Sequence, residues 1–141
     1  MERLAESSAG INHLVPLARA ANTYKGSGFD ASGCLGVLFQ VAAGDIAAGG
    51  TLNVKIQESD TDSDLAYADI TGAAIAQLGD TGDNSLCQID VRVGGLAAGT
   101  RKKYLRAYAV VAGNTVCFAV IARKYDVQAQ PVVNTPATVY V

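Results

Sequence analysis

The chain has 141 residues, of which half are hydrophobic and 17% are charged, and its formal net charge is −2. That composition excludes a disordered chain, and the near-neutral charge excludes a global field that would recruit nucleic acid or an anionic membrane. The length indicates one domain with a sizeable core. No apolar run approaches the roughly 18 residues of a membrane span, and the first ten residues lack the apolar segment of a secretory signal. We therefore expect a soluble protein that is made in a cytoplasm.

The amino-terminal part predicts an arm followed by an edge strand. Residues 1–11 show no period and predict an arm outside the main domain. The segment HLVPLARAANTY, residues 13–24, predicts a strand, which Pro16 confines to a sheet edge or an irregular entry because proline donates no ladder hydrogen bond. The following KGSGFDASG is rich in residues that favour turns.

Residues 12–126 predict the main domain, because several segments there alternate apolar and polar residues as strands do. The expected inward residues are Leu35, Val37, Phe39 and Val41 in CLGVLFQVAA, Leu52, Val54 and Ile56 in TLNVKIQE, and Cys87, Ile89, Val91 and Val93 in LCQIDVRV. Leu38 on the opposite face predicts that part of its strand is covered on both sides. KKYLRAYAVV and TVCFAVIARKY flank a short link at 112–114, which predicts a β-hairpin.

Helical patterns are short. Residues 72–80 could form one or two helical turns, and DIAAGG after Gly44 predicts a loop because its two glycines would end a helix. Strands separated by frequent turns favour an all-β, antiparallel sandwich or barrel. Residues 127–141, VQAQPVVNTPATVYV, are broken by Pro131 and Pro136 and predict an extended carboxy-terminal arm. That arm would lie on its own sheet edge or on a neighbouring subunit.

The candidate metal and redox residues fit structural roles better. Cys34, Cys87 and Cys117 lie in apolar runs and predict buried free thiols, with one disulfide as the alternative. Asp60, Asp62 and Asp64 have the spacing that opens a calcium loop. The sixth and twelfth positions of that loop require glycine and glutamate, and here they are Leu65 and Thr71. We expect a solvated turn between strands, with no metal and no cofactor.

No catalytic residue is predicted. His13 is the single histidine, and no nucleophile motif, metalloprotease motif or phosphate-binding loop accompanies it. The basic run TRKKYLR places Arg101, Lys102, Lys103 and Arg106 near two tyrosines, a pattern that nucleic-acid binders share. The sequence pI of about 5.2 disfavours nucleic acid. A solvated strand end and a contact with an acidic patch on a protein partner both remain open.

The order of the segments resembles a family of small tailed-phage head proteins, of β-sandwich or jelly-roll type, that decorate or cement the capsid. VKIQESD followed by YADITGA and then by RKKYLRAYAVV carries most of the resemblance, which spans roughly residues 13–124. It implies a non-enzymatic virion protein on the outer capsid surface, assembled in the host cytoplasm. Its partners would be the major capsid protein and a second copy of itself, in a dimer at two-fold positions, with no direct contact to nucleic acid or membrane.

The family's arms and loops vary, so the partner-binding residues are candidates drawn from this sequence. They are Arg101, Lys102, Lys103, Pro131, Val132, Val133, Val139, Tyr140 and Val141. A carbohydrate-binding module is an alternative, although the chain has no Trp and only 6% aromatic residues to stack on a sugar. Another structural protein of a phage head or tail is the second alternative.

Overall fold

The computed structural model describes residues 8–94 and 101–125 as nine antiparallel strands and two short 3₁₀ turns. The strands are β1 (Ser8–Arg19), β2 (Asn22–Lys25), β3 (Phe29–Asp30), β4 (Gly36–Ile46), β5 (Thr51–Ser59), β6 (Ala68–Ala74), β7 (Leu86–Arg92), β8 (Tyr104–Ala112) and β9 (Val116–Tyr125). The 3₁₀ turns are η1 (Asp64–Ala66) and η2 (Asp80–Gly82). No helix in the described part is long and apolar enough to cross a membrane.

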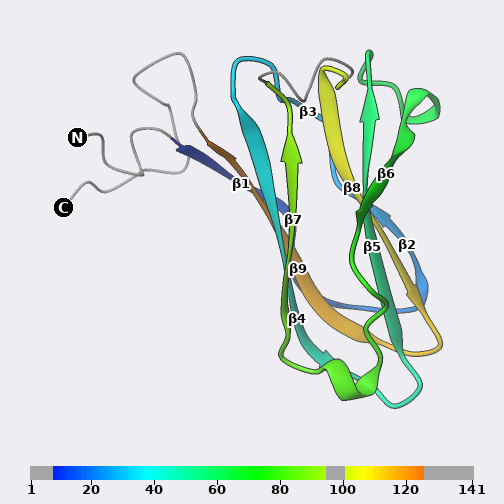
Figure 1. Cartoon of the computed structure of the whole chain (residues 1–141). Helices are drawn as coiled ribbons and strands as arrows, with labels where there is room; N and C mark the ends of the chain where they lie inside the picture. The colour runs from blue at the N-terminus through cyan, green and yellow to red at the C-terminus, as the bar shows by residue number, and fades with distance from the viewer. Residues whose placement is uncertain (1–7, 95–100, 126–141) are drawn as a thin grey trace, which may run out of the picture.

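The strands form two sheets that face each other (Figure 1). Sheet A has the order β1-β9-β4-β7, and sheet B has the order β2-β8-β5-β6, with β3 paired to β8. Sheet A has four strands and sheet B has five, with β2 and β3 both pairing with β8. The chain passes repeatedly from one sheet to the other, as it does in a jelly roll. The predicted all-β, antiparallel sandwich of jelly-roll type is confirmed.

The core lies between the sheets and follows the predicted alternation. Fully buried side chains come from the inner faces of both sheets: Val37, Phe39 and Val41 of β4, Leu52, Val54 and Ile56 of β5, and Phe118 and Val120 of β9. Ile89 and Val91 of β7 are also buried. Leu35, Cys87 and Val93 are only half-buried, because they stand at strand ends, and Leu38 on the outer face is half-buried too.

The edge position predicted for the first strand is confirmed. β1 pairs only with β9, and its register shifts twice between Asn12 and Leu17, around Pro16. β1 begins at Ser8, which lies inside the segment 1–11 that predicted an arm. The boundaries of the arms and of the main domain otherwise stay predictions.

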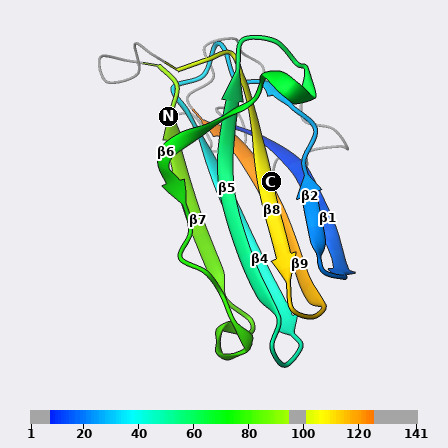
Figure 2. The same cartoon turned by 90° about the vertical axis from the view of Figure 1, so that its right-hand side faces the viewer.

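The predicted hairpin of the last two strands is wrong. β8 pairs with β2, β3 and β5 in sheet B, whereas β9 pairs with β1 and β4 in sheet A (Figure 2). The link between them, which contains Gly113 at φ 75°, carries the chain across the core. The inner faces of β8 and β9 are both apolar, and they bury one another only when the strands lie in opposite sheets.

The helical turns predicted over residues 72–80 are also wrong. β6 extends to Ala74, the Ile75 N–H donates to the Val54 carbonyl, and Leu78 pairs with Leu52 in an isolated bridge. This segment follows the edge of β5 because that route satisfies its backbone groups. The three cysteines are free, and Cys34 is buried, whereas Cys87 and Cys117 are half-buried.

Candidate functional site

The acidic segment connects β5 to β6, and its carboxylates are held by side chains of the chain itself. Because β5 and β6 are paired and antiparallel, the predicted turn between strands is confirmed. Asp60, Asp62 and Asp64 contact, in that order, Lys102, Tyr67, and the pair Lys25 and Arg106. Within residues 8–94 and 101–125, no group of three His, Cys, Asp or Glu side chains is placed to hold a metal ion.

Arg106 fastens this loop to the outer face of sheet B. Its side chain projects outward from β8 but is 6% exposed, because the loop covers it. The Arg106 Nε donates to Gln57 at 2.8 Å, and its terminal nitrogens donate to the carboxylate and the backbone carbonyl of Asp64. Its guanidinium lies 4.0 Å from the centre of the Tyr67 ring. Gln57 in turn donates to Asp69 at 2.8 Å, which extends the network to β6.

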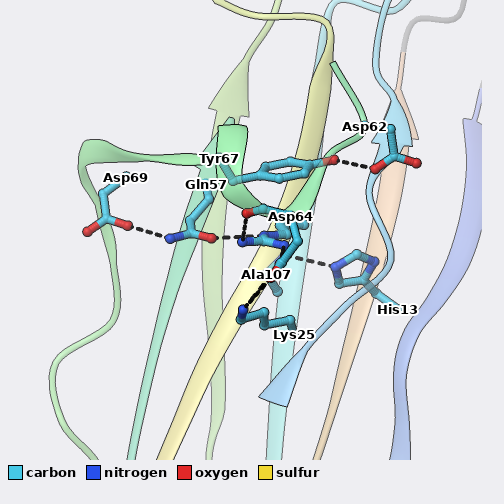
Figure 3. A network of polar contacts seen from close by, with 9 residues as sticks. His13, Lys25, Gln57, Asp62, Asp64, Tyr67, Asp69 and Ala107 are labelled. Atoms are coloured by element: carbon cyan, nitrogen blue, oxygen red, sulfur yellow. Dashed lines mark hydrogen bonds and ion pairs between the residues drawn. The ribbon is translucent and has the colours of Figure 1, made fainter. Parts of the chain in front are cut away.

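The network holds fixed charges at neutral pH. The hydrogen bond from Arg106, with a second from Lys25, lowers the pKa of Asp64. Partial burial and the hydrogen bond to the Asp62 carboxylate raise the pKa of Tyr67 to about 12. Figure 3 shows the Tyr67 hydroxyl directed at Asp62, with Asp64 below the ring. Asp64 and Tyr67 therefore keep one protonation state through the neutral range.

Replacing Arg106 by leucine should lower the free energy of unfolding by about 2 kcal/mol, because charge-assisted hydrogen bonds are lost and the Gln57 side-chain oxygen loses its donor. Urea unfolding followed by circular dichroism measures the effect. Lys103→Met is the matched control. Lys103 makes an exposed ion pair with Asp30 and lies over the Tyr104 ring, and its replacement should change stability by less than about 1 kcal/mol. Equal losses in both variants would contradict the anchoring role.

His13 is a buried structural residue. The side chain is 9% exposed and its Nε2 accepts a hydrogen bond from the Ala107 N–H at 2.8 Å, across the core from β1 to β8 (Figure 3). β2 ends at Lys25 and β3 begins at Phe29, so β8 has no strand partner there to receive that N–H. The imidazole takes the place of the missing ladder acceptor. Burial lowers the pKa of His13 to about 4, which keeps Nε2 free to accept.

The predicted basic run lies where the chain enters β8, and each cation there meets a carboxylate of this chain. Arg101 Nε lies 3.6 Å from Glu58, Lys102 Nζ lies 3.4 Å from Asp60, and Lys103 Nζ lies 3.4 Å from Asp30. The charge of Asp30 raises the pKa of Lys103. Each of these three cations is balanced by one carboxylate, and the pairs remain partly exposed. That the run contacts a protein partner stays a prediction.

The remaining candidates lie outside the described residues. They are Pro131, Val132, Val133, Val139, Tyr140 and Val141. The last described residue before them is Tyr125 at the end of β9, and it pairs with Ser8 at the start of β1. The Tyr125 carbonyl also accepts the Leu35 N–H, next to the pocket that Lys102 and Lys103 line. The chain therefore enters and leaves the sandwich at the end where the basic run lies, which we call the arm end.

Sequence reasoning missed the outer face of sheet A. Among the described residues, five large apolar side chains are exposed, and four of them lie on this sheet. On the outer face, Leu86 of β7 is 63% exposed, Val15 of β1 is 52% exposed and Ile121 of β9 is 38% exposed. Leu17 is 56% exposed but pairs with the buried Phe118, so it belongs to the inner face at the edge of the sheet. The signal was present in the sequence, since Leu86 and Ile121 occupy outward positions of alternating strands, where polar residues are usual.

No family model and no curated protein matches this chain. Its fold is similar to solved structures. The PBSX exported protein XepA has a TM-score of 0.61 and 17% identity, over 100% of this chain and 44% of that one. Chains of infectious bursal disease virus, Gx and Gt strains, have TM-scores of 0.56 and 0.55 and identities of 8% and 12%, over 88% of this chain and 33% of theirs. This chain thus spans less than half the length of those chains and shares their fold.

Proposed function

We propose that this protein is a structural virion component that binds the outer surface of a tailed-phage capsid. It cements neighbouring subunits of the major capsid protein and so resists the pressure of the packaged DNA. The observation that carries the proposal is the arm end. The start of β1 at Ser8, the end of β9 at Tyr125 and the basic run 101–103 lie at the same end of the sandwich. Because these features share one end of the sandwich, all of them could contact the same capsid surface.

Two further observations support this function. The fold is shared with chains of a virus structure, although at identities too low to carry function from one protein to the other. The buried polar groups are used structurally: His13 completes the β8 ladder, and Arg106 anchors the loop at 60–67. Adhesion without catalysis fits these roles, and we propose that the protein is not an enzyme.

Cementing follows from simultaneous attachment at more than one place. A protein that bridges two shell subunits dissociates only when all its contacts break together, which raises its effective affinity by about 10²- to 10⁴-fold without any new chemistry. Extended arms can supply such contacts by adding a strand to an exposed sheet edge of the shell protein, since main-chain hydrogen bonds depend little on side-chain identity. Residues 127–141 are the proposed arm.

Deleting residues 127–141 should lower the occupancy of the protein on capsids by at least tenfold, because one of its attachment points is lost. Occupancy is measured by quantitative gel analysis of purified capsids incubated with the variant. A chain whose residues 127–141 are replaced by a Gly/Ser segment of equal length is the matched control. It should fail like the deletion, because it lacks the β-branched residues of the arm, which favour the extended strand that the pairing requires. Full occupancy of both variants would eliminate the role of the arm.

A further inference from the structure

We propose that the exposed edge of β7 is a binding site for an extended segment of the major capsid protein, which adds to sheet A as an antiparallel strand. The inference rests on the proposed function and deepens it, because it assigns one contact with the shell to a defined part of the sandwich. In this contact the shell protein supplies the strand and this chain supplies the sheet edge.

Among the described strands, each sheet has two edges, and three of these four edges are interrupted. β1 contains Pro16 and two register shifts against β9. One edge of sheet B is divided between β2 and β3, which residues 26–28 separate. In β6, residues 70–73 form a bulge opposite Ile56 of β5, and Gly72 has a φ of 81°. Proline, short strands and bulges are devices that prevent a sheet edge from pairing with another chain.

The fourth edge, β7, has none of these interruptions. It pairs with β4 in an unbroken register from Leu86 to Arg92, and it contains no proline. Its inward side chains, Cys87, Ile89 and Val91, carry no charge that would oppose a neighbouring strand. β7 is therefore the edge of the sandwich that is suited to strand addition.

The hydrogen bonds to β4 show which backbone groups of β7 face outward. The Ala43 N–H donates to the Ser85 carbonyl, and the Val93 N–H donates to the Leu35 carbonyl. Because antiparallel ladders alternate, the bonds between β7 and β4 fall on odd-numbered residues. Within residues 8–94 and 101–125, β7 has no partner strand on its other side. The residues whose N–H and C=O groups point to that side are Leu86, Gln88, Asp90 and Arg92.

This edge of β7 opens into a groove between the two sheets. The groove has a volume of about 490 Å³ and lies between β7 and the bulge of β6, which stand side by side (Figure 2). Ile89 and Val91 line it from β7, and Ile70 and Ala73 line it from β6. Side chains alternate along a strand, so residues of an added strand opposite Ile89 and Val91 enter the groove. The bound segment should therefore carry apolar residues at alternate positions.

Arg92 adds a charge requirement at the arm end of β7. It pairs with Gly36, which also pairs with Tyr125, so Arg92 lies at the end of the sandwich that is proposed to contact the shell. Its side chain is exposed and forms no ion pair within the described residues. Asp90, the nearest acidic residue on the same face of β7, accepts a hydrogen bond from the Tyr125 hydroxyl at 2.7 Å. An acidic residue opposite Arg92 would therefore stabilise the added strand.

The direction of the added strand agrees with attachment at the arm end. β7 runs toward the arm end, because Arg92 is its last residue. A segment that leaves the shell there and runs away from it lies antiparallel to β7, which is the more stable pairing. In its own direction, that segment has an acidic residue opposite Arg92, apolar residues opposite Val91 and Ile89, and a polar residue between them.

A synthetic peptide with the sequence Glu-Val-Thr-Val-Thr-Val-Thr tests the proposal. It is titrated into the full chain labelled with ¹⁵N, and the amide signals are followed by NMR. The amides of Gln88 and Asp90 should shift most, and their hydrogen exchange should slow by about tenfold or more, because they donate to the peptide carbonyls. The absence of binding, or shifts centred on another sheet edge, would overturn the proposal.

Gln88→Pro removes one outward N–H and leaves the bonds to β4 in place. It should weaken peptide binding by about fivefold or more, because proline cannot donate to the added strand. Gln88→Thr is the matched control, since it changes the same side chain but keeps the N–H, and it should bind like the wild type. The dispersion of the amide signals shows whether each variant is folded. Equal binding by a folded Gln88→Pro variant would contradict strand addition at β7.

Arg92→Glu is a second variant, and it leaves every backbone group in place. It should weaken binding of the peptide, and a peptide with lysine in place of the glutamate should bind this variant better than it binds the wild type. A variant that shows no such reversal would overturn the assigned register and with it the proposal. Because these titrations contain no capsid, their failure is distinct from a failure of capsid binding, which the occupancy assay measures.

Discussion

Replacing Gly26 by alanine should lower the free energy of unfolding by about 2–4 kcal/mol. A Cβ at this position would overlap the imidazole ring of His13. The ring cannot retreat, because Phe29 and Phe39 pack edge-on against it with centroids at 5.5 and 5.9 Å. Overpacking of this kind costs about 1–3 kcal/mol, and displacing His13 leaves the buried Ala107 N–H without its acceptor, at a similar further cost. Urea unfolding measures the change.

Two variants make this experiment specific. Gly79→Ala is the matched control, because no atom lies within 4 Å of the added Cβ, and it should change stability by less than about 0.5 kcal/mol. Adding His13→Ala to Gly26→Ala should cost less than the sum of the two single changes, because His13→Ala removes the ring that the new Cβ overlaps, and both changes lose the same hydrogen bond to the Ala107 N–H. Strict additivity would show that Gly26 and His13 do not interact as described.

Acid should weaken the fold through His13. The pKa of this histidine is lowered by burial from 6.5 to about 4, so the unfolded chain binds its proton at a pH where the folded chain cannot. Stability is therefore complete above pH 6.5 and falls as the pH drops toward 4. The loss between pH 7.5 and 4.5 should be about 2–3 kcal/mol. Unfolding in urea at a series of pH values gives the curve.

His13→Gln identifies the source of that pH dependence. The glutamine amide oxygen can accept from the Ala107 N–H but does not titrate, so the variant should have a nearly flat stability curve between pH 7.5 and 4.5. Asp64 and Asp69 have lowered pKa values, and their contributions are present above pH 3.8 and lost only below it. They do not act in this window. Parallel curves for the wild type and His13→Gln would refute the assignment.

Local pattern was sufficient for most of the strands. Alternation over 52–56 and 37–41 identified inner faces that are fully buried, since a half-buried strand imposes a period of two on its own sequence. Pro16 marked an edge strand, because proline cannot donate to a ladder. The aspartates at 60, 62 and 64 were recognised as a turn from the missing glycine and glutamate of a calcium loop. Each of these inferences depends on residues that are close in sequence.

The errors concern contacts between distant residues. Two alternating strands joined by a short link are compatible with a hairpin and with a crossing of the core, and only the partners of β8 and β9 decide between them. The bond between His13 and Ala107 joins residues 94 apart, and no local signal foretells it. Leu86, Ala42 and Ala119 are recognised as neighbours on the outer face of sheet A only when the register places them in one row.

The fold gathers the features of the proposed attachment surface. The jelly roll brings the chain entry, the chain exit and the basic run together at the arm end. The network of Arg106, Asp64 and Tyr67 holds the neighbouring loop against sheet B. A rigid sandwich of this kind loses little conformational entropy on binding, which favours attachment.

Electron cryo-microscopy of capsids assembled with the full-length chain tests the central claim most directly. The account predicts regular density for the sandwich on the outside of the shell, in copies that outnumber any single-vertex protein. Those copies should stand with their arm ends against the shell. Capsids that lack this density, or that show the chain only at one vertex or in the tail, would contradict it.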